Sequence, residues 1–357
     1  TVGKCIFEDD EKKTLRISIL QLLRLFRDFF REQITAGTYL RKTEQRIEQL
    51  FKESTGKREN NGSALFLRCD LPYYYMAGGS LGHIAGVVNN LEECTGYRPI
   101  FVSSRDIPTV EQDVIRYAIT PGVQYKNAGD IMSIAYNDNI EKTLEKVFQN
   151  ENIAFIYQRS ALNAFAGIEY AMKKKVPFVL EYNGSEIWIA KNWGNREIKG
   201  LTISEKIERL TFEKADLITC VSSPLKQQLI DMGIEERKII VTPNGVNVDM
   251  YRPDVSGNEV RQKYGIDETK VVIGFIGTFG AWHGAEILTE AFSEVSTKQK
   301  NVHLLMIGDG IKMAEVKDII DKNHLEHRVT LTGIVPQKDG PQYLAACDIL
   351  VSPTIKN

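Results

Sequence analysis

Apolar residues recur with helical spacing over residues 14–56. The intervals of three and four are those of one face of an amphipathic helix. Arginines lie mostly outside this apolar stripe, at Arg16, Arg24, Arg27 and Arg31. A basic helix over residues 14–32 is able to make a peripheral contact with an anionic membrane, but we favour packing against its own protein. The polar residues that follow predict a linker.

From residue 64 onward the pattern changes to short apolar runs that alternate with helical stretches. The predicted strands of this first series are 64–69, 99–104, 153–158, 177–183, 217–222 and 238–243. The predicted helices between them are 81–94, 141–149, 160–174, 204–214 and 224–232. Runs that are apolar throughout, separated by helices, are typical of a parallel sheet covered on both faces.

A second series of the same kind starts after residue 265. Its predicted strands are 271–276, 302–307, 328–332 and 348–352, and its predicted helices are 284–297, 311–323 and 339–346. We therefore predict an α/β protein with two Rossmann-like, doubly wound domains in tandem. The predicted boundaries are a helical N-terminal extension at 1–60, a first domain at 61–245 and a second at 246–357. Four strands are fewer than the roughly six of a Rossmann-like half, so we expect an incomplete second domain.

Composition fits a globular enzyme and narrows the possible partners. The chain has 357 residues, long for a single core, and 26% of them are charged. Its net charge of -2 gives no general reason to bind nucleic acid, and no apolar run is long enough to span a bilayer. The five cysteines are scattered without C-x-x-C spacing, which indicates a reducing compartment rather than disulfides or a zinc site.

A glycine loop, GGSLGH at 78–83, opens the first predicted helix of the first domain. It matches G-x-S-x-G, the spacing of a hydrolase nucleophile elbow, but such a serine must follow its strand directly and here DLPYYYMA intervenes. We interpret Gly78, Gly79 and Ser80 instead as a place where backbone N–H groups approach an anion. A hydrolase that uses Ser80 remains the alternative.

A second glycine loop, IGTFGAWHG, follows the strand at 271–276. Neither loop has the G-x-G-x-x-G spacing of dinucleotide sites or the G-x-x-x-x-G-K-[ST] of P-loops. The chain also has no D-x-D, the usual handle for a divalent metal on a nucleoside diphosphate. We interpret His324 and His327 as solvated side chains at a polar helix end rather than metal ligands.

Polar residues stand at the ends of the predicted strands, where open α/β sheets bind ligands. Arg159 and Glu181 end two strands of the first domain. A structural ion pair and a functional role are both compatible with that position.

From about residue 64 to its end, the chain resembles family 4 of the retaining, nucleotide-sugar-dependent glycosyltransferases of the GT-B fold. The matching segments are GGSLGH, ADLITCVSSPLKQQL, IIVTPNGVNVDMYRP, IGFIGTFGAWHGAEILTEAF, LLMIGDG and VTLTGIVPQKDGPQYLAACDILVSP. The resemblance implies two domains facing across a cleft, with the donor nucleotide in the second and the acceptor mainly against the first. It implies transfer to a glycan or lipid-linked acceptor in bacterial surface polysaccharide or glycoconjugate synthesis, in the cytoplasm or at the inner face of the plasma membrane.

The resemblance also implies a set of donor contacts. These are Gly78, Gly79, Ser80, Gly277, Thr278, His283, Gly308, Asp309, Val335 and Pro336. Thr278 and His283 stand where the family loop has an Arg and a Lys on the diphosphate, so this chain has less fixed positive charge there. His283 would help most when protonated, and Arg159 is a candidate to supply part of the missing charge.

For the chemistry itself, the resemblance points to the strand ends of the first domain. Asn183 stands where family members often carry a His, and an amide binds a sugar hydroxyl but is neither acid nor base. We group Asn183, Arg159 and Glu181 as catalytic candidates, and His83 and Glu186 as acceptor-binding candidates. The donor phosphate is commonly taken to accept the acceptor's proton in such enzymes, and we expect no metal and no other cofactor.

The family's acidic E-x7-E segment would fall beyond Asn357. We therefore expect the chain as given to lack some donor contacts. A noncatalytic GT-B module that binds a nucleotide or a partner subunit is a further alternative.

Overall fold

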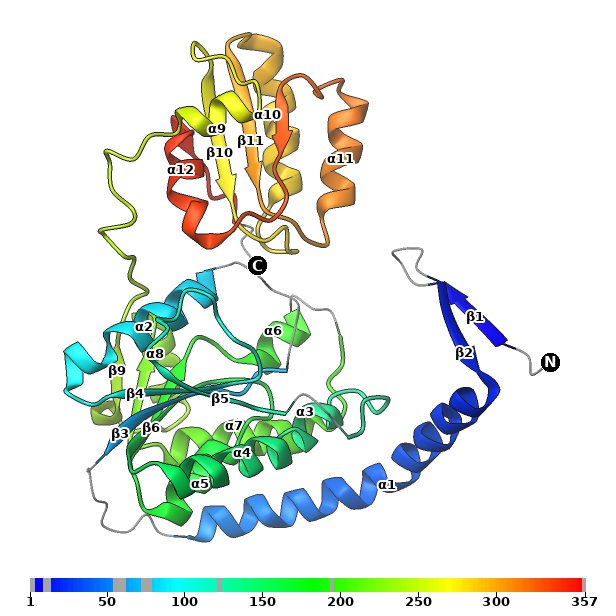
Figure 1. The fold of residues 1–357 in the computed structure, drawn as a ribbon, viewed down its shortest axis with the longest axis vertical. Coiled ribbons are helices and arrows are strands. Elements are labelled where there is room, and N and C mark those ends of the chain that lie inside the picture. Colours follow the sequence, from blue (N-terminus) through cyan, green and yellow to red (C-terminus); the bar gives the residue numbers. More distant parts are fainter. Residues whose placement is uncertain are drawn as a thin grey trace.

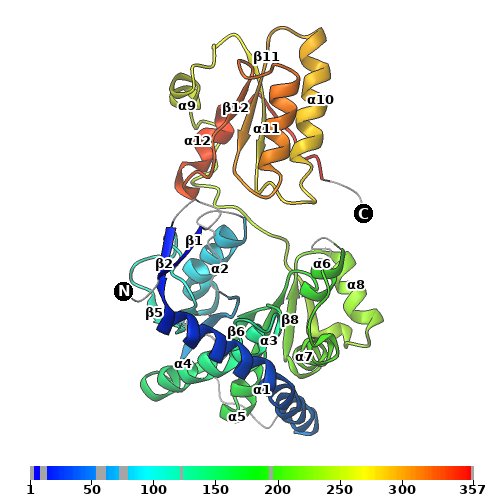
Figure 2. The same cartoon turned by 90° about the vertical axis from the view of Figure 1, so that its right-hand side faces the viewer.

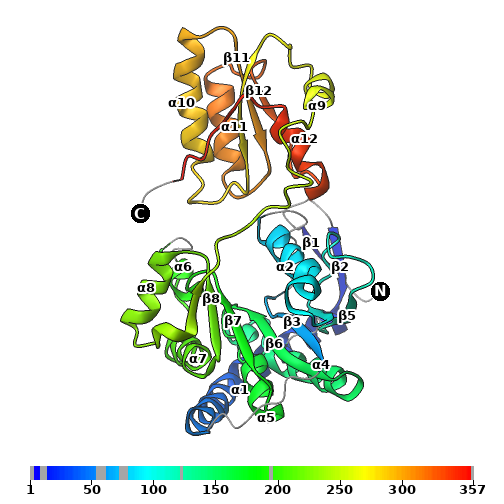
Figure 3. The ribbon, with the colours of Figure 1, turned by 90° about the vertical axis from the view of Figure 1, so that its left-hand side faces the viewer.

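The computed structural model describes residues 4–8, 14–53, 62–71, 79–120, 124–192 and 196–354, with side chains from residue 18 onward. It contains two α/β domains and an N-terminal extension, as the sequence predicts. Figures 1, 2 and 3 show the second domain stacked on the first, joined by an extended segment at residues 242–257.

The first domain is built on a seven-stranded sheet whose neighbouring strands are all parallel, in the order β5-β4-β3-β6-β7-β8-β9. The strands are β3 (Ser63–Arg68), β4 (Pro99–Ser103), β5 (Ile115–Ala118), β6 (Ile153–Arg159), β7 (Phe178–Tyr182), β8 (Leu217–Cys220) and β9 (Ile239–Val241). Six were predicted from their apolar runs. The missed strand, β5, is at the sheet edge and has no fully buried residue, so it lacks such a run.

Helices cover both faces of this sheet. They are α2 (Gly79–Thr95), α3 (Ile131–Ala135), α4 (Asn137–Asn150), α5 (Ala166–Lys174), α6 (Glu186–Asn192), α7 (Leu201–Lys214), α8 (Ser223–Asp231) and the 3₁₀ turn η1 (Glu236–Lys238). The predicted helix at 160–174 begins later, at Ala166. There Asn137 Oδ1 accepts hydrogen bonds from the backbone N–H groups of Phe165 (2.8 Å) and Ala166 (2.9 Å), which fixes the start of α5.

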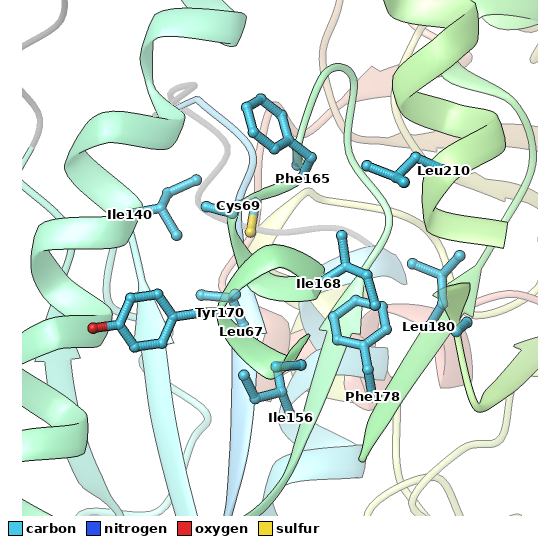
Figure 4. Close-up of a cluster of buried hydrophobic side chains, with 14 of the residues drawn as sticks. Leu67, Cys69, Ile140, Ile156, Phe165, Ile168, Tyr170, Phe178, Leu180 and Leu210 are labelled. Atoms are coloured by element: carbon cyan, nitrogen blue, oxygen red, sulfur yellow. The ribbon is translucent and has the colours of Figure 1, made fainter. Parts of the chain in front are cut away.

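Successive residues of β3 enter two different cores, because side chains alternate across a strand. Leu65 and Leu67 pack with α4, α5 and α7 in the larger core, part of which Figure 4 shows. Phe66 packs on the other face against α2, where it stacks on Tyr157 with ring centroids 5.2 Å apart. This burial on both faces explains the uniformly apolar strand runs.

The second domain has four parallel strands in the order β12-β11-β10-β13. They are β10 (Val271–Ile276), β11 (Val302–Ile307), β12 (Val329–Leu331) and β13 (Ile349–Leu350), and the helices are α9 (Asn258–Lys263), α10 (Ala285–Lys298), α11 (Met313–Lys322), α12 (Gly340–Ala345) and the 3₁₀ turn η2 (Gln337–Asp339). All four strands and three of these helices were predicted. The six-residue α9 is too short to show a helical period.

The N-terminal extension is a hairpin followed by one long helix. Strands β1 (Lys4–Glu8) and β2 (Thr14–Ser18) pair antiparallel, and α1 runs over Ile19–Lys52. The predicted helical start at residue 14 was therefore wrong. Ser18 begins the helix instead: its hydroxyl accepts from the Gln21 N–H, and the Gln21 side chain accepts from the Ser18 N–H, which is a capping box.

The second half of α1 packs on the first domain, as we favoured from the sequence. Its buried residues are Ala36, Thr43, Ile47 and Leu50. Polar contacts hold the same half in place. Arg46 pairs with Glu141 and Glu169, and Lys206 pairs with Glu44 and Glu48. At the end of the helix, the Lys214 ammonium donates to the carbonyls of Phe51 and Glu53. The first half behaves differently, with most of its large apolar side chains exposed.

Candidate functional site

Glu181 is the centre of a polar cluster at the carboxyl ends of β6 and β7. It is 2% exposed, and its Oε1 accepts hydrogen bonds from Arg159 Nη1 and from Asn183 Nδ2, the latter at 2.6 Å. His83 Nε2, on α2, lies 3.2 Å from the same oxygen. Arg159 and Glu181 are partners in the β6–β7 register, which places them side by side. The structural ion pair that the sequence left open is present, and four predicted site residues come together around it.

The cluster keeps Glu181 ionised. Burial raises the pKa of this carboxyl, but the hydrogen bonds and charges of His83, Arg159 and Asn183 together outweigh burial and leave the pKa below its ordinary value of 4.5. Tyr157, two residues before Arg159 on β6, adds a neutral phenol: it hydrogen-bonds Thr219 Oγ1 at 3.2 Å, and burial raises its pKa. Glu181 therefore holds its partners through a fixed negative charge.

This charge predicts an acid-dependent loss of stability. A carboxyl whose folded pKa is lowered stabilises the fold fully above its unfolded pKa, near 4.5, and the contribution disappears as pH falls through the folded pKa. We expect the difference in free energy of unfolding between the wild type and Glu181→Gln to be constant from about pH 7 to about pH 5 and to shrink below that. Urea titrations at stepped pH measure it. A difference that grows on acidification would contradict the assigned ionisation.

The arrangement around Asn183 decides what its side chain offers to a ligand. Its Nδ2 is engaged by Glu181, so Oδ1 is the atom that remains to accept a hydrogen bond. An oxygen held in this way is suited to a hydroxyl of a sugar.

A small cavity of about 30 Å³ with a mixed polar and apolar lining adjoins the cluster, between β6, β7, α6 and α7. Glu186 and Glu208 line it, together with the buried amides of Gln158 and Asn163. Burial raises the pKa of both carboxyls, although Arg159 acts in the opposite direction on Glu186 and a hydrogen bond from Ser185 does so on Glu208. Part of the Glu186 residue is exposed to solvent, although protein atoms surround its carboxyl group closely. The cavity has room for about one or two water molecules.

In the second domain, three predicted loops meet at the carboxyl ends of β10, β11 and β12. The N–H of Gly277 donates to the carbonyl of Ile307 (3.0 Å), that of Phe279 to the carbonyl of Asp309 (2.9 Å), and that of Gly308 to the carbonyl of Gly333 (3.0 Å). Gly308 has a φ of +133°, and a Cβ there would overlap the carbonyl oxygen of Gly277. The close approach of these loops therefore requires glycine at 308.

Thr278 and His283 lie together beside this meeting point. Thr278 Oγ1 is 3.2 Å from His283 Nδ1, and burial lowers the pKa of the imidazole below its ordinary 6.5. His283 lines a hollow of about 230 Å³ with Ser352 and Thr354, beside the carboxyl ends of β10 and β13. Since α10 begins directly after Gly284, its positive dipole end lies next to the imidazole.

The other predicted donor residues are placed as follows. Val335 is 8% exposed in a core with Leu305 and Tyr343, whereas Pro336 is exposed. Asp309 is exposed, and its Oδ1 accepts from the Gly310 N–H at 2.7 Å.

The N-terminal end of α2 lies against the second domain. A Cβ at Gly82 would overlap the Gln337 side chain, so the helix that follows the first glycine loop contacts the segment after β12. Gly79 and Ser80 are exposed in the first turn of α2, and Gly78 lies outside the described residues. Sequence reasoning missed Gln337 and Tyr157. Tyr157 carried a signal, since it is two residues before Arg159 and so shares its face of β6.

The hydrolase alternative for Ser80 finds little support. Ser80 lies within a helix, and among the described side chains no hydrogen bond joins it to His83, which faces Glu181 instead.

Comparison with known families decides between these possibilities. Residues 77–250 match the family model described as Glycosyltransferase Family 4, and residues 256–356 match the one described as Glycosyl transferases group 1. The two models together cover most of the chain, and the longer one is that of glycosyltransferase family 4. The resemblance stated from the sequence is confirmed, and the two family models adjoin where the chain crosses from the first sheet to the second.

Relatives of this chain include glycosyltransferases from distant organisms. The phosphatidylinositol N-acetylglucosaminyltransferase GPI3 subunit of Saccharomyces cerevisiae is 28% identical over 151 residues, which are 42% of this chain and 33% of the yeast protein. The chain thus spans about a third of that relative's length. An uncharacterized glycosyltransferase of Methanocaldococcus jannaschii is 21% identical over 80% of this chain and 74% of its own length.

Solved structures confirm the GT-B fold. HepE of Anabaena, in complex with UDP-glucose, superposes with a TM-score of 0.61 at 19% identity, over 81% of this chain and 73% of HepE. WaaG, a glycosyltransferase involved in lipopolysaccharide biosynthesis, gives a TM-score of 0.59 at 14% identity, over 83% of this chain and 75% of WaaG. At these identities the likeness concerns the fold.

Proposed function

We propose that this protein is a retaining glycosyltransferase that moves a sugar from a nucleoside-diphosphate sugar to a glycan or lipid-linked acceptor. The observation that carries the proposal is the meeting of Gly277, Gly308 and Gly333 at three strand ends. Relatives support the donor class, since HepE was solved with UDP and with UDP-glucose. The yeast relative is named as an N-acetylglucosaminyltransferase.

In this proposal the donor diphosphate lies at the loop of Gly277 and Thr278, next to the start of α10. Backbone N–H groups and the helix dipole stabilise the departing diphosphate, because the loop carries no Arg or Lys. Arg159 contributes less than its full charge, because Glu181 already pairs with it. The absence of D-x-D from the sequence supports a reaction without a metal.

The acceptor and the transferred sugar then lie against the first domain. Asn183 Oδ1 accepts a hydrogen bond from a sugar hydroxyl, with the amide oriented by Glu181. His83 and Glu186 are the proposed acceptor contacts, and the donor phosphate takes the acceptor's proton. Because Glu181 stays ionised and already paired, its role is to position Asn183 and Arg159 rather than to transfer a proton.

We propose that the protein acts in the cytoplasm, in the synthesis of a bacterial surface polysaccharide or glycoconjugate. Free cysteines at Cys69, Cys94, Cys220 and Cys347 support a reducing compartment.

Calorimetric titration with UDP, GDP and dTDP tests the donor site first. We expect one of the three to bind, and we expect the matching sugar nucleotide to be turned over when a glycan acceptor is present. Binding without turnover on any acceptor would favour a noncatalytic module. No binding of any of the three would overturn the proposal.

The pH dependence of donor binding depends on His283. Because burial lowers its pKa below 6.5, the ring is neutral at pH 7 to 8, and donor affinity is expected to be flat there and to tighten below about pH 6 as the ring gains a proton. His283→Lys should bind the donor about 10-fold more tightly at pH 8, because it adds a permanent charge. His283→Gln is the matched neutral control and should show no acid tightening. A Lys variant that binds no more tightly than the wild type would exclude this role.

A further inference from the structure

The first half of α1 carries a continuous exposed apolar surface, the α1 apolar face. Its residues are Ile19, Leu20, Leu23, Leu25, Phe26, Phe29, Phe30 and Ile34, each between 41% and 79% exposed. Single exposed apolar residues are ordinary on protein surfaces, but a contiguous set of this size marks an interaction site. Figure 1 shows this part of α1 running beyond the elements that its second half packs against.

Most of this face lies off the surface by which α1 packs on its own domain, although Leu25 and Phe29 are in line with Ala36. Leu23, Phe26, Phe30 and Ile34 form one row at helical intervals, and the same row continues into the second half as Thr38, Arg41, Gln45 and Glu48. Those four residues are polar and exposed, whereas the packing residues Ala36, Thr43 and Ile47 lie between a third and a half of a turn away around the helix. The row that begins at Leu23 is therefore an apolar surface that lies away from the side on which α1 packs on the domain.

Arginines border the α1 apolar face on one side. Arg24, Arg27 and Arg31 follow each other at intervals of three and four, and all three are exposed. Two acidic residues lie in the same stretch: Asp28 pairs with Arg27 at 2.7 Å, and Glu32 accepts hydrogen bonds from the N–H and Nδ2 of Asn127 at 3.0 Å. Three arginines against these two acidic residues leave residues 19–34 with a net charge of +1, which favours a negatively charged surface.

We propose that residues 19–34 bind the anionic surface of a lipid bilayer, with α1 lying in the plane of the interface. The phenylalanines and leucines would enter the boundary of the acyl chains, and the arginines would lie at the lipid phosphates. None of the described helices is long and apolar enough to cross a membrane, so the contact is peripheral. The proposal concerns attachment and stands apart from sugar transfer.

A second copy of the chain fits this face less well. The apolar arc from Leu25 through Phe26 to Leu20 covers roughly 200° of the helix, far wider than the seam of a two-helix contact. In an antiparallel pair about a two-fold axis, the arginine border would also face the same border of its copy. A flat charged surface meets neither difficulty.

Cosedimentation with vesicles tests the proposal. The probes are vesicles of phosphatidylcholine alone and of phosphatidylcholine with phosphatidylglycerol in equal amounts. We expect binding to the second kind, weakened by salt, and an affinity about 100-fold lower or more in Phe26→Glu with Phe30→Glu. Ile311→Glu, at a position 79% exposed in the second domain, is the matched control and should bind as the wild type does.

Further measurements separate the possible failures. Arg24→Gln with Arg31→Gln should lower the preference for anionic vesicles, and the phenylalanine variant should keep wild-type helicity and nucleotide binding. Wild-type vesicle affinity in the phenylalanine variant would overturn the proposal. So would a concentration-dependent dimer that binds no vesicles and that the same variant dissociates. A loss of nucleotide binding alone would count against the proposed function and leave this proposal intact.

Discussion

Replacing Glu181 by alanine is expected to destabilise the protein by about 3 kcal/mol and to abolish sugar transfer. The change leaves Arg159 without its partner on a mostly buried strand end, and breaking a buried pair on one side typically costs about 3–5 kcal/mol. The lower end applies because the Arg159 side chain is 20% exposed. Urea unfolding gives the stability change, and turnover of the sugar nucleotide gives the activity change.

Two further variants separate folding from function at this cluster. Arg159→Ala with Glu181→Ala removes both charges, so it should recover part of the lost stability but none of the activity. Glu181→Gln keeps an oxygen that can accept from Asn183 Nδ2 and should retain more activity than alanine does. The loss expected for a broken buried pair is about 3 kcal/mol or more. If the free energy of unfolding of Glu181→Ala lies within about 1 kcal/mol of the wild-type value, the cluster does not organise this strand end.

The second large effect is expected for Gly308→Ala. A φ of +133° is open to glycine and not to alanine, and the added Cβ would displace the carbonyl of Gly277 from the loop proposed to hold the diphosphate. We expect a loss of about 3 kcal/mol in the free energy of unfolding and, in protein that is still folded, a loss of measurable nucleotide binding.

Gly333 offers the matched control, because its carbonyl accepts a hydrogen bond from Gly308 while the space around its Cα is open. Its φ is +69°, and no atom lies within 4 Å of where a Cβ would stand. Gly333→Ala should therefore cost only the left-handed strain, about 1 kcal/mol, and should lower nucleotide affinity far less than Gly308→Ala does. Equal losses in the two variants would mean that backbone strain alone, and not the contact with Gly277, explains the result at 308.

The elements that could be predicted from the sequence are those with a regular pattern of apolar residues over several positions. Strands buried on both faces, such as β3 and β4, can be recognised as apolar runs, because nearly every residue meets a core. The edge strand β5 and the short helices α3, α6 and α9 were missed, because neither a few half-exposed residues nor one or two turns establish a period. The start of α1 was misplaced because Leu15 and Ile19 fit a helical interval by chance.

The sequence predicted which strand ends carry the site residues, but it did not predict which of those residues contact each other. Sheet order places Arg159 beside Glu181, which the tandem strand pattern could indicate. His83 reaches Glu181 from α2, and Gln337 approaches Gly82 from the other domain. Such pairings depend on how helices and domains settle on each other, and no local spacing encodes them.

The 34 residues of α1 form one unbroken helix about 50 Å long. Its second half is fastened to the first domain by Arg46, Lys206 and Lys214. If the first half is bound to a surface, the rigid helix transmits its orientation to the first domain. The tilt of α1 against that surface would then set the angle of the whole domain, and with it the direction from which an acceptor reaches Asn183.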